Sequence, residues 1–305
     1  MNRLRELSLQ TENMKYSITH RTTYTYFEPV SVCHNMLRLV SRNTDRQFCR
    51  SVKVKIYPEP DTLHQYEDFF GNTVIYFSIE KGHAQLTVTV HSEIEKMPSV
   101  AREINLYENA AIEKVKQDLL EDRQEAGEIR QYIFETPMTT WNEEIANYAR
   151  VSFRPGRSVL EAAGDLMHRI HTDFRFTPGF TTVSTPLAAV MRERKGVCQD
   201  FAHLAIACIR SVGLPARYVS GYIETISPPG TEKLIGVDAS HAWFSVYIPN
   251  MGWVDFDPTN NVLPADQHIT IGWGRDYADI APMKGILLSS GSHGLAVSVD
   301  VRRVG

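Results

Sequence analysis

The sequence lacks the features that mark nucleic-acid, membrane and metal-cluster proteins. The 305-residue chain has a net charge of −4 and no basic run, so its composition does not indicate a nucleic-acid partner. It has no apolar segment near the roughly 20 residues that span a bilayer, so we expect no membrane contact. The cysteines lack the paired close spacing that binds zinc, and we expect neither metal nor cofactor. They are Cys33, Cys49, Cys198 and Cys208.

The N-terminal segment also lacks the apolar core of a signal peptide. Residues 1–13 are polar and charged and are expected to form a flexible extension. Without an export signal, we expect a cytoplasmic location and reduced thiols.

Length and a hydrophobic content of 43% are sufficient for two domains. We expect an α+β protein in which a β-rich unit precedes a unit of mixed helices and strands. The expected divisions are the extension over 1–13, a β-sandwich over 14–98, a helical linker over 99–150, the mixed unit over 151–280 and C-terminal strands over 281–305.

Alternating apolar and polar positions predict strands throughout the first unit. Short strands separated by turn residues favour an antiparallel β-sandwich. The predicted strands cover 16–26, 52–56, 74–78 and 86–90. His20 lies on a strand face and is expected to be structural. The segment 295–301 alternates in the same way and is expected to return to this sandwich as one more strand.

A helix is predicted to begin at Cys198, because five apolar residues then recur at steps of three and four. These are Phe201, Ala202, Ala205, Ile206 and Ile209. A shorter helix is expected before it, starting at Thr185-Pro186 and ending at a left-handed Gly196. A thiol in the first turn lies beside free N–H groups and the positive end of the helix dipole. Both favour the thiolate and lower the pKa of the thiol below the free value of about 8.5.

Position alone does not make Cys198 a nucleophile, because free cysteines are usually small buried hydrophobes. Cys208 lies ten residues farther along the same helix and is expected to be inert. The reactive interpretation of Cys198 therefore depends on finding a base and a carboxylate nearby.

A hairpin supplies both partners if its loop has the right length. Strands over 240–248 and 253–257 flank a turn. With five residues in the loop, Tyr247 faces Trp253, and His241 and Asp257 are diagonal neighbours about 7–8 Å apart. A loop of four residues would place them on opposite faces. Asp255 is the rival carboxylate, and this register places it farther from His241.

These residue types fit nucleophilic attack on an amide. A cysteine needs an imidazole that takes its proton and later protonates the leaving amine. A carboxylate on the far ring nitrogen fixes the tautomer and stabilises the imidazolium. Cys198, His241 and Asp257 are therefore the candidate catalytic residues. A zinc site made from the same three residues is disfavoured, because no second cysteine has suitable spacing.

Three sequence blocks resemble the bacterial transglutaminase-like superfamily: Gly196–Phe201, Ser240–Trp243 and Gly252–Thr259. The first strands resemble the β-rich region of a bacterial branch described as cysteine proteases. The resemblance implies a papain-like catalytic core over 151–280 and a triad of Cys198, His241 and Asp257. The tryptophan that helps animal transglutaminases to bind the oxyanion has no counterpart between Trp141 and Cys198. The Cys198 N–H is one expected donor and the second is unassigned.

Four further residues are expected to line the substrate groove: Gln199, Tyr222, Asp238 and Trp243. Asp200, at the helix N-terminus, is expected to be structural. The expected reaction is peptide or isopeptide hydrolysis through a thioester. Transamidation of protein glutamine and a non-catalytic peptide-binding module are the alternatives. The substrate and oligomeric state do not follow from the sequence.

Overall fold

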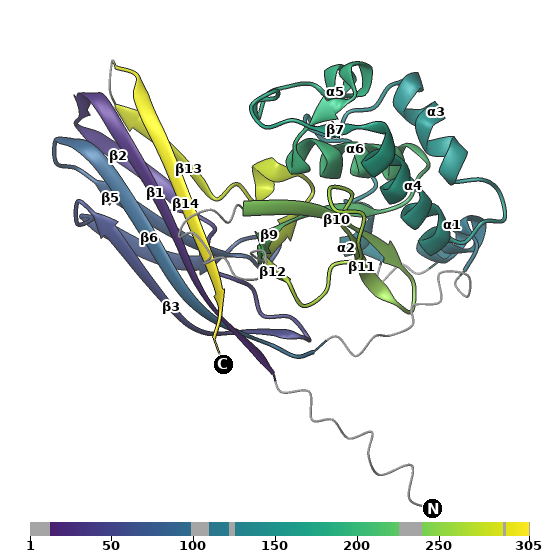
Figure 1. Ribbon diagram of the computed structural model, residues 1–305, viewed down its shortest axis with the longest axis horizontal. Coiled ribbons are helices and arrows are strands. Elements are labelled where there is room, and N and C mark those ends of the chain that lie inside the picture. Colours follow the sequence, from purple (N-terminus) through teal and green to yellow (C-terminus); the bar gives the residue numbers. More distant parts are fainter. Residues whose placement is uncertain (1–12, 99–109, 122–125, 226–239, 289–290, 305) are drawn as a thin grey trace, which may run out of the picture.

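The computed structural model describes residues 13–98, 110–121, 126–225, 240–288 and 291–304. Figure 1 shows a β-rich unit beside a unit in which helices cover a sheet. The mixed helix and strand composition agrees with the expected α+β class. Among the described residues, no helix combines the length and the apolar character of a membrane span.

The β-rich unit consists of two four-stranded antiparallel sheets. Their apolar faces meet in one core, to which Ile18 and Phe77 contribute from different sheets. The first sheet has the order β14 (His293–Arg303), β1 (Met14–Val30), β6 (His83–Lys96) and β3 (Gln47–Tyr57). The second has the order β13 (Met283–Leu288), β2 (Val32–Leu37), β5 (Thr73–Ile79) and β4 (Thr62–Glu67).

The C-terminal strand lies in the first sheet. β14 pairs with β1 from Tyr16↔Arg303 to Tyr26↔His293, so the end of the chain is bound to its first strand. β13 pairs with β2 in the other sheet. The chain thus leaves the β-rich unit, forms the second unit and returns.

The second unit is built on the sheet β11–β10–β9–β12. Its strands are β11 (Gly252–Phe256), β10 (Ser240–Ile248), β9 (Ala216–Ile223) and β12 (His268–Gly274). Helix α6 (Cys198–Ser211) packs on one face of this sheet, and Phe201 through Arg210 are buried. The remaining elements are α1 (Ile112–Glu121), α2 (Ala126–Arg130), α3 (Glu143–Ser152), α4 (Val159–Asp173), β7 (Arg175–Phe176), α5 (Leu187–Glu193), β8 (Lys195–Gly196) and the 3₁₀ turn η1 (Tyr277–Asp279).

Helices α1 and α3 belong to this unit, which corrects the expectation of a linker over 99–150. Val115 of α1 and Ile145 of α3 are buried in the same apolar cluster as α6. Glu113, Lys114 and Glu121 lie on the exposed face of α1. At the start of α4, Ser158 Oγ accepts a hydrogen bond from the Glu161 N–H at 3.2 Å, as its sequence predicts.

The face of the sheet opposite α6 is covered by the β-rich unit. Gln47 Nε2 donates to the Thr270 carbonyl at 2.7 Å, and Asn72 Nδ2 donates to the Trp273 carbonyl at 2.8 Å. Tyr222 of β9 joins the apolar core of the β-rich unit. Both faces of this sheet are therefore covered, by helices on one side and by the first unit on the other.

Candidate active site

Cys198 is the first residue of α6, as predicted. The helix start is fixed by Asp200, whose Oδ2 accepts from the Val197 N–H at 2.8 Å and from the Thr181 hydroxyl at 2.6 Å. The structural role expected for Asp200 is thus confirmed. Gly196 leaves room for this carboxylate, since a Cβ there would lie 2.8 Å from Asp200 Oδ2.

The helix before Cys198 differs from the prediction at both ends. Its N-cap is Pro186, which makes no side-chain capping bond, and the helix spans Leu187–Glu193. It ends at Arg194, which takes the left-handed conformation with φ of 52°. Gly196 lies in the short strand β8 and is needed for space rather than for a helix stop.

The hairpin that carries the base has the predicted register. Tyr247 pairs with Trp253, Ser245 pairs with Asp255, and Ile248 pairs with Gly252. The loop between the paired residues covers 249–251, which is shorter than the expected five residues but gives the same register, and the proximity of the two functional groups depended on that register. His241 Nε2 lies 2.8 Å from Asp257 Oδ2. Asp255 instead accepts a hydrogen bond from the Ser245 hydroxyl.

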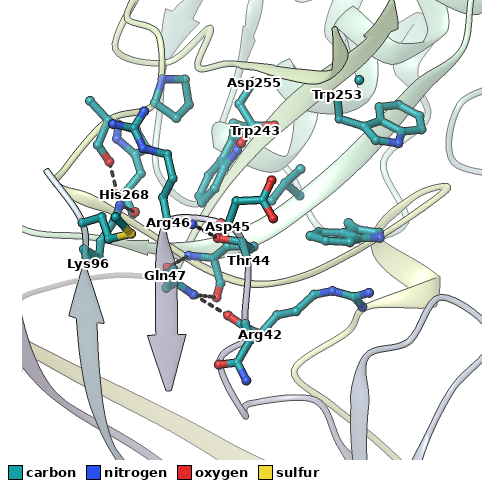
Figure 2. A pocket seen from close by; sticks show the side chains of 18 of the residues that line it. Arg42, Thr44, Asp45, Arg46, Gln47, Lys96, Trp243, Trp253, Asp255 and His268 are labelled. Carbon is teal, nitrogen blue, oxygen red and sulfur yellow. Dashed lines mark hydrogen bonds between the residues drawn. The ribbon is translucent and has the colours of Figure 1, made fainter. Parts of the chain in front are cut away.

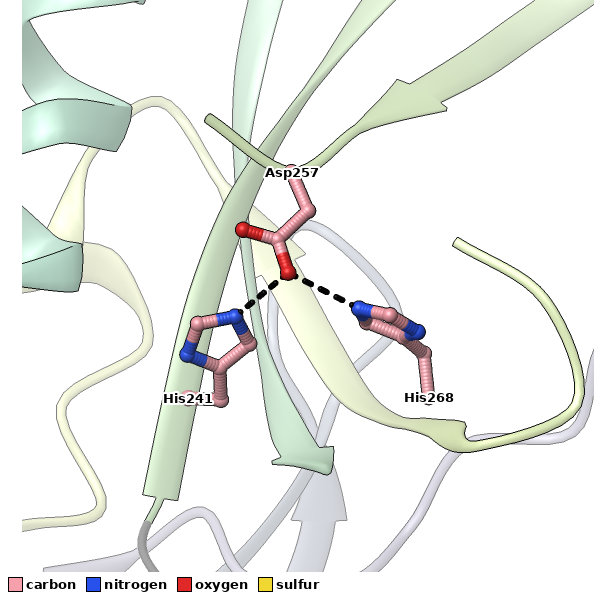
Figure 3. A group of neighbouring side chains, drawn as sticks. All are labelled: His241, Asp257 and His268. Carbon is pink, nitrogen blue, oxygen red and sulfur yellow. Dashed lines mark hydrogen bonds and ion pairs between the residues drawn. The ribbon is translucent and has the colours of Figure 1, made fainter. Parts of the chain in front are cut away.

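Asp257 is completely buried and accepts five hydrogen bonds. Oδ2 receives His241 Nε2 at 2.8 Å and His268 Nε2 at 2.9 Å (Figure 3). It also receives Asn260 Nδ2 at 2.7 Å. Oδ1 receives the N–H groups of Thr259 and Asn260 at 2.9 and 3.2 Å. Burial opposes ionisation, but the bonds from both imidazoles and from Asn260 outweigh it and hold the pKa of Asp257 well below its ordinary value.

His241 has the opposite shift. Burial lowers its pKa, but the hydrogen bonds to Asp257 and to Cys198 and their charges raise it to about 9. The ring thus binds the buried carboxylate, and the nearby thiol at the helix start contributes to its raised pKa. Since Nε2 is bound to Asp257, Nδ1 is the nitrogen available to the thiol. The structure therefore brings Cys198, His241 and Asp257 together.

Two members of this cluster, Asn260 and His268, were not foreseen. Asn260 follows the return strand by a few residues, and its side chain turns back onto Asp257. Its position in a Pro-Thr-Asn turn was the available sequence signal. His268 begins β12, and its contact with Asp257 depends on sheet order rather than on local spacing.

The residues expected to line the groove differ in exposure and in contacts. Gln199 is half-buried beside Cys198. Trp243 is fully buried and packs on Gly221, where a Cβ would lie 2.4 Å from the ring carbon Cη2. Tyr222 is 1% exposed and its hydroxyl bonds His20 Nδ1 at 2.9 Å, which makes both residues structural. Trp243 and Tyr222 therefore present no surface to a substrate here, contrary to expectation. Asp238 lies outside the described residues.

Cys208 is enclosed in the helical core, and burial raises its pKa to about 12. Its Sγ contacts the Ile145 carbonyl at 3.8 Å. This environment suppresses the thiolate, in agreement with the expectation that Cys208 is inert.

His241, Asp257 and His268 each offer an atom within 4.8 Å of the others, a spacing that could hold a metal ion. The nitrogen–oxygen distances of 2.8 and 2.9 Å are those of hydrogen bonds to a charged acceptor. Asn260 and two backbone N–H groups supply the remaining donors. The acceptor oxygens of Asp257 are thus satisfied by N–H donors of the protein.

Comparisons with known proteins agree with this geometry. Residues 16–95 match the family model described as the bacterial transglutaminase-like N-terminal region, and residues 146–258 match the transglutaminase-like superfamily. An uncharacterised protein of Mycobacterium tuberculosis is 37% identical over 292 residues, which cover 94% of this chain and 92% of that protein. The second match contains Cys198, His241 and Asp257.

Two further similarities differ in extent. The crystal structure of a "putative cysteine protease" from Cytophaga hutchinsonii superimposes with a TM-score of 0.75 at 20% identity, covering 97% of this chain and 92% of the other. This likeness shows the fold. A protein-glutamine gamma-glutamyltransferase of Pseudomonas aeruginosa is 36% identical over 72 residues, which are 23% of this chain and 11% of that protein.

Proposed function

Because this chain belongs to the transglutaminase-like superfamily, we propose that it is a thiol-dependent acyl-transfer enzyme that hydrolyses peptide or isopeptide amides. Cys198 is the nucleophile, His241 the acid and base, and Asp257 the carboxylate that orients the imidazole. The observation that carries the proposal is the placement of one buried imidazole between the helix-start thiol and a carboxylate 2.8 Å away.

The proposed reaction has two halves. The Cys198 sulfur attacks the amide carbonyl, the C–N bond breaks, and the His241 imidazolium gives its proton to the leaving amine. A thioester and a neutral imidazole result. Water then attacks the thioester, His241 takes its proton, and the carboxylic acid leaves as the thiolate–imidazolium pair re-forms. Asp257 remains ionised throughout, since its five hydrogen bonds oppose protonation.

The start of α6 supplies the charge stabilisation that the tetrahedral intermediate needs. Backbone N–H groups in the first turn of a helix have no intrahelical acceptor, and the Cys198 N–H is one of them. Gln199 follows directly and is half-buried, and we assign it to substrate contact.

Transamidation is the second candidate, favoured by the 72-residue sequence match to the Pseudomonas glutamyltransferase. It uses the same thioester with a lysine amine as acceptor in place of water. The experiment is to incubate the protein with casein and with a fluorescent primary amine. Hydrolysis predicts new peptide ends without amine incorporation, whereas transamidation predicts amine on glutamine and release of ammonia. Neither product should form with Cys198→Ala.

A peptide-binding module without turnover is the third alternative. It predicts that wild type and Cys198→Ala bind peptides equally and that neither changes them. Failure of wild type to form either product on a broad panel of peptides, together with unchanged binding by the variant, would reject the enzymatic proposal.

A further inference from the structure

A cavity of about 550 Å³ lies between the catalytic sheet and the β-rich unit (Figure 2). One wall is the outward face of the sheet, including Trp253 and Asp255. The other wall is the segment 42–47 with Lys96 of β6. Three of the four tryptophans of the chain line the cavity: Trp243, Trp253 and Trp273. Cys198 is not among the lining residues, so this space is separate from the proposed reaction centre.

Arg217 is a buried cation in the wall of this cavity. It is 8% exposed, and its guanidinium lies 3.8 Å from the Trp273 ring centre and 4.3 Å from that of Trp253. Its Nε has no hydrogen-bond acceptor within the part of the chain that the structure describes. The Nε1–H of Trp243, which lines the same cavity, also has no acceptor there. Buried donors of this kind require a partner, because leaving one unpaired costs about 1–3 kcal/mol.

The other basic side chains of the cavity are engaged. Lys96 Nζ donates to the Ala265 carbonyl at 2.7 Å and also to the His268 carbonyl. Arg46 donates to the Pro98 carbonyl at 2.6 Å.

Arg42 Nη1 donates to the Phe70 carbonyl at 2.7 Å, and its guanidinium stacks on Trp273 at 3.8 Å. Asp255, the carboxylate that attracts Arg217, accepts a hydrogen bond from Ser245. Asp45 and Asp266 also line the cavity, so its wall carries four basic and three acidic side chains. Burial disfavours the charge of Arg217 and lowers its pKa to about 10. The charge of Asp255 favours the cation, but no carboxylate among the described residues forms a salt bridge with Arg217.

We propose that this cavity is a binding site for a small organic carboxylate, with Arg217 as its anchor. A planar guanidinium pairs with a planar carboxylate through two parallel hydrogen bonds. Trp253 and Trp273 add apolar lining beside Arg217, and the volume suits a compact ligand. The carboxylate belongs either to a free organic acid or to the C-terminus of a short peptide.

The position of the site gives it contact with the catalytic cluster. His268 lines the cavity, and its Nε2 holds Asp257 at 2.9 Å. A bound ligand would therefore contact His268, the residue that holds the Asp257 carboxylate.

Tryptophan fluorescence provides the test, because three of the four tryptophans line the cavity. We would titrate full-length Cys198→Ala protein at constant ionic strength with two matched pairs of probes. The first pair is benzoate and benzamide. The second is N-acetyl-alanyl-phenylalanine with a free carboxylate and the same peptide as its amide. Cys198→Ala prevents turnover, so failure of the proposed enzymatic function would leave this test intact.

We expect at least one acid to change the fluorescence and to bind about tenfold or more tightly than its amide, since each pair differs only in charge. Arg217→Met should abolish this preference, and Arg217→Lys should restore part of it, as charge remains but the fork is lost. Arg302→Gln, an exposed change in β14, is the matched control and should bind as the parent does.

If Arg217→Met does not fold, the test uses Arg217→Lys and Arg46→Gln, both at the cavity wall. Each should bind the acid more weakly than the Cys198→Ala parent does. Binding of the first acid alone assigns the site to free organic acids, and binding of the second alone assigns it to peptide C-termini. Equal binding of acid and amide, no fluorescence change with either acid, or unaltered acid binding in all folded Arg217 and Arg46 variants would overturn the proposal.

Discussion

His268 Nε2 donates a hydrogen bond to Asp257 Oδ2 at 2.9 Å, so the carboxylate that holds His241 is itself held by a second imidazole (Figure 3). Both rings meet the same oxygen. His268 is 6% exposed, and its backbone carbonyl accepts from Lys96 of the β-rich unit. The His241–Asp257 pair is thus supported by a residue that the first unit helps to position.

Replacing Asp257 should change the titration of His241. In Asp257→Asn, burial of the ring persists while the Asp257 charge that opposes it is gone and only Cys198 still favours the imidazolium, so the His241 pKa should fall from about 9 toward its ordinary value near 6.5. NMR titration of the His241 ring resonances measures this. Acyl transfer should fall by about 10²- to 10⁴-fold, the usual range for loss of acid–base catalysis. A His241 pKa unchanged by the substitution would contradict the assigned contact.

The same pair should make stability depend on pH. Since the folded-state pKa of His241 is raised, its contribution is fully present below about pH 6.5 and is lost as pH rises through about 9. The loss should approach about 3 kcal/mol by the linkage relation. The pKa of Asp257 is lowered, so its contribution is present above about pH 4 and declines as pH falls further.

Urea unfolding of wild type and Asp257→Asn at pH 6 and pH 10 measures this contribution. Their difference in unfolding free energy should shrink at the higher pH. A difference that stays constant over this range would argue against the buried ion pair.

His268 should act through hydrogen bonding rather than through bulk. His268→Leu leaves Asp257 Oδ2 with one donor fewer and should slow acylation about tenfold per folded molecule. His268→Gln can still donate and should recover part of that loss. The check is the acylation rate together with the melting temperature of each variant. Equal rates in both variants at unequal stability would assign His268 a purely structural role.

Gly196 should tolerate no side chain. An alanine Cβ would lie 2.8 Å from Asp200 Oδ2 and would displace the carboxylate that caps α6. We expect Gly196→Ala to destabilise the protein by about 1–3 kcal/mol and to lower Cys198 reactivity. Gly82→Ala is the control, because no atom lies within 4 Å of a Cβ built there. Similar effects of the two substitutions on unfolding would contradict this role for Gly196.

The hairpin register shows where sequence reasoning succeeds. Alternation fixes which residues share a face, and one loop length then decides whether His241 can meet Asp257. The start of α6 at Cys198 follows in the same way from its apolar spacing. These features depend on segments that are close in the chain.

Long-range packing explains the errors. Tyr222 does not line the expected groove, because the β-rich unit covers it and His20 binds its hydroxyl. His268 reaches Asp257 only because β12 pairs with β9 in this sheet order. Such contacts arise from the arrangement of distant strands, for which no local pattern exists.

The most direct test of the account is site-specific labelling of the thiol at the helix start. The protein would be treated at pH 7 with a limiting amount of a peptide-based thiol trap. Intact mass and peptide mapping would then identify the modified cysteine. We predict one adduct on Cys198, none on Cys198→Ala, and a rate at least tenfold lower in His241→Ala. Modification of Cys49 or Cys208 in preference to Cys198, or equal rates with and without the His241 ring, would contradict it.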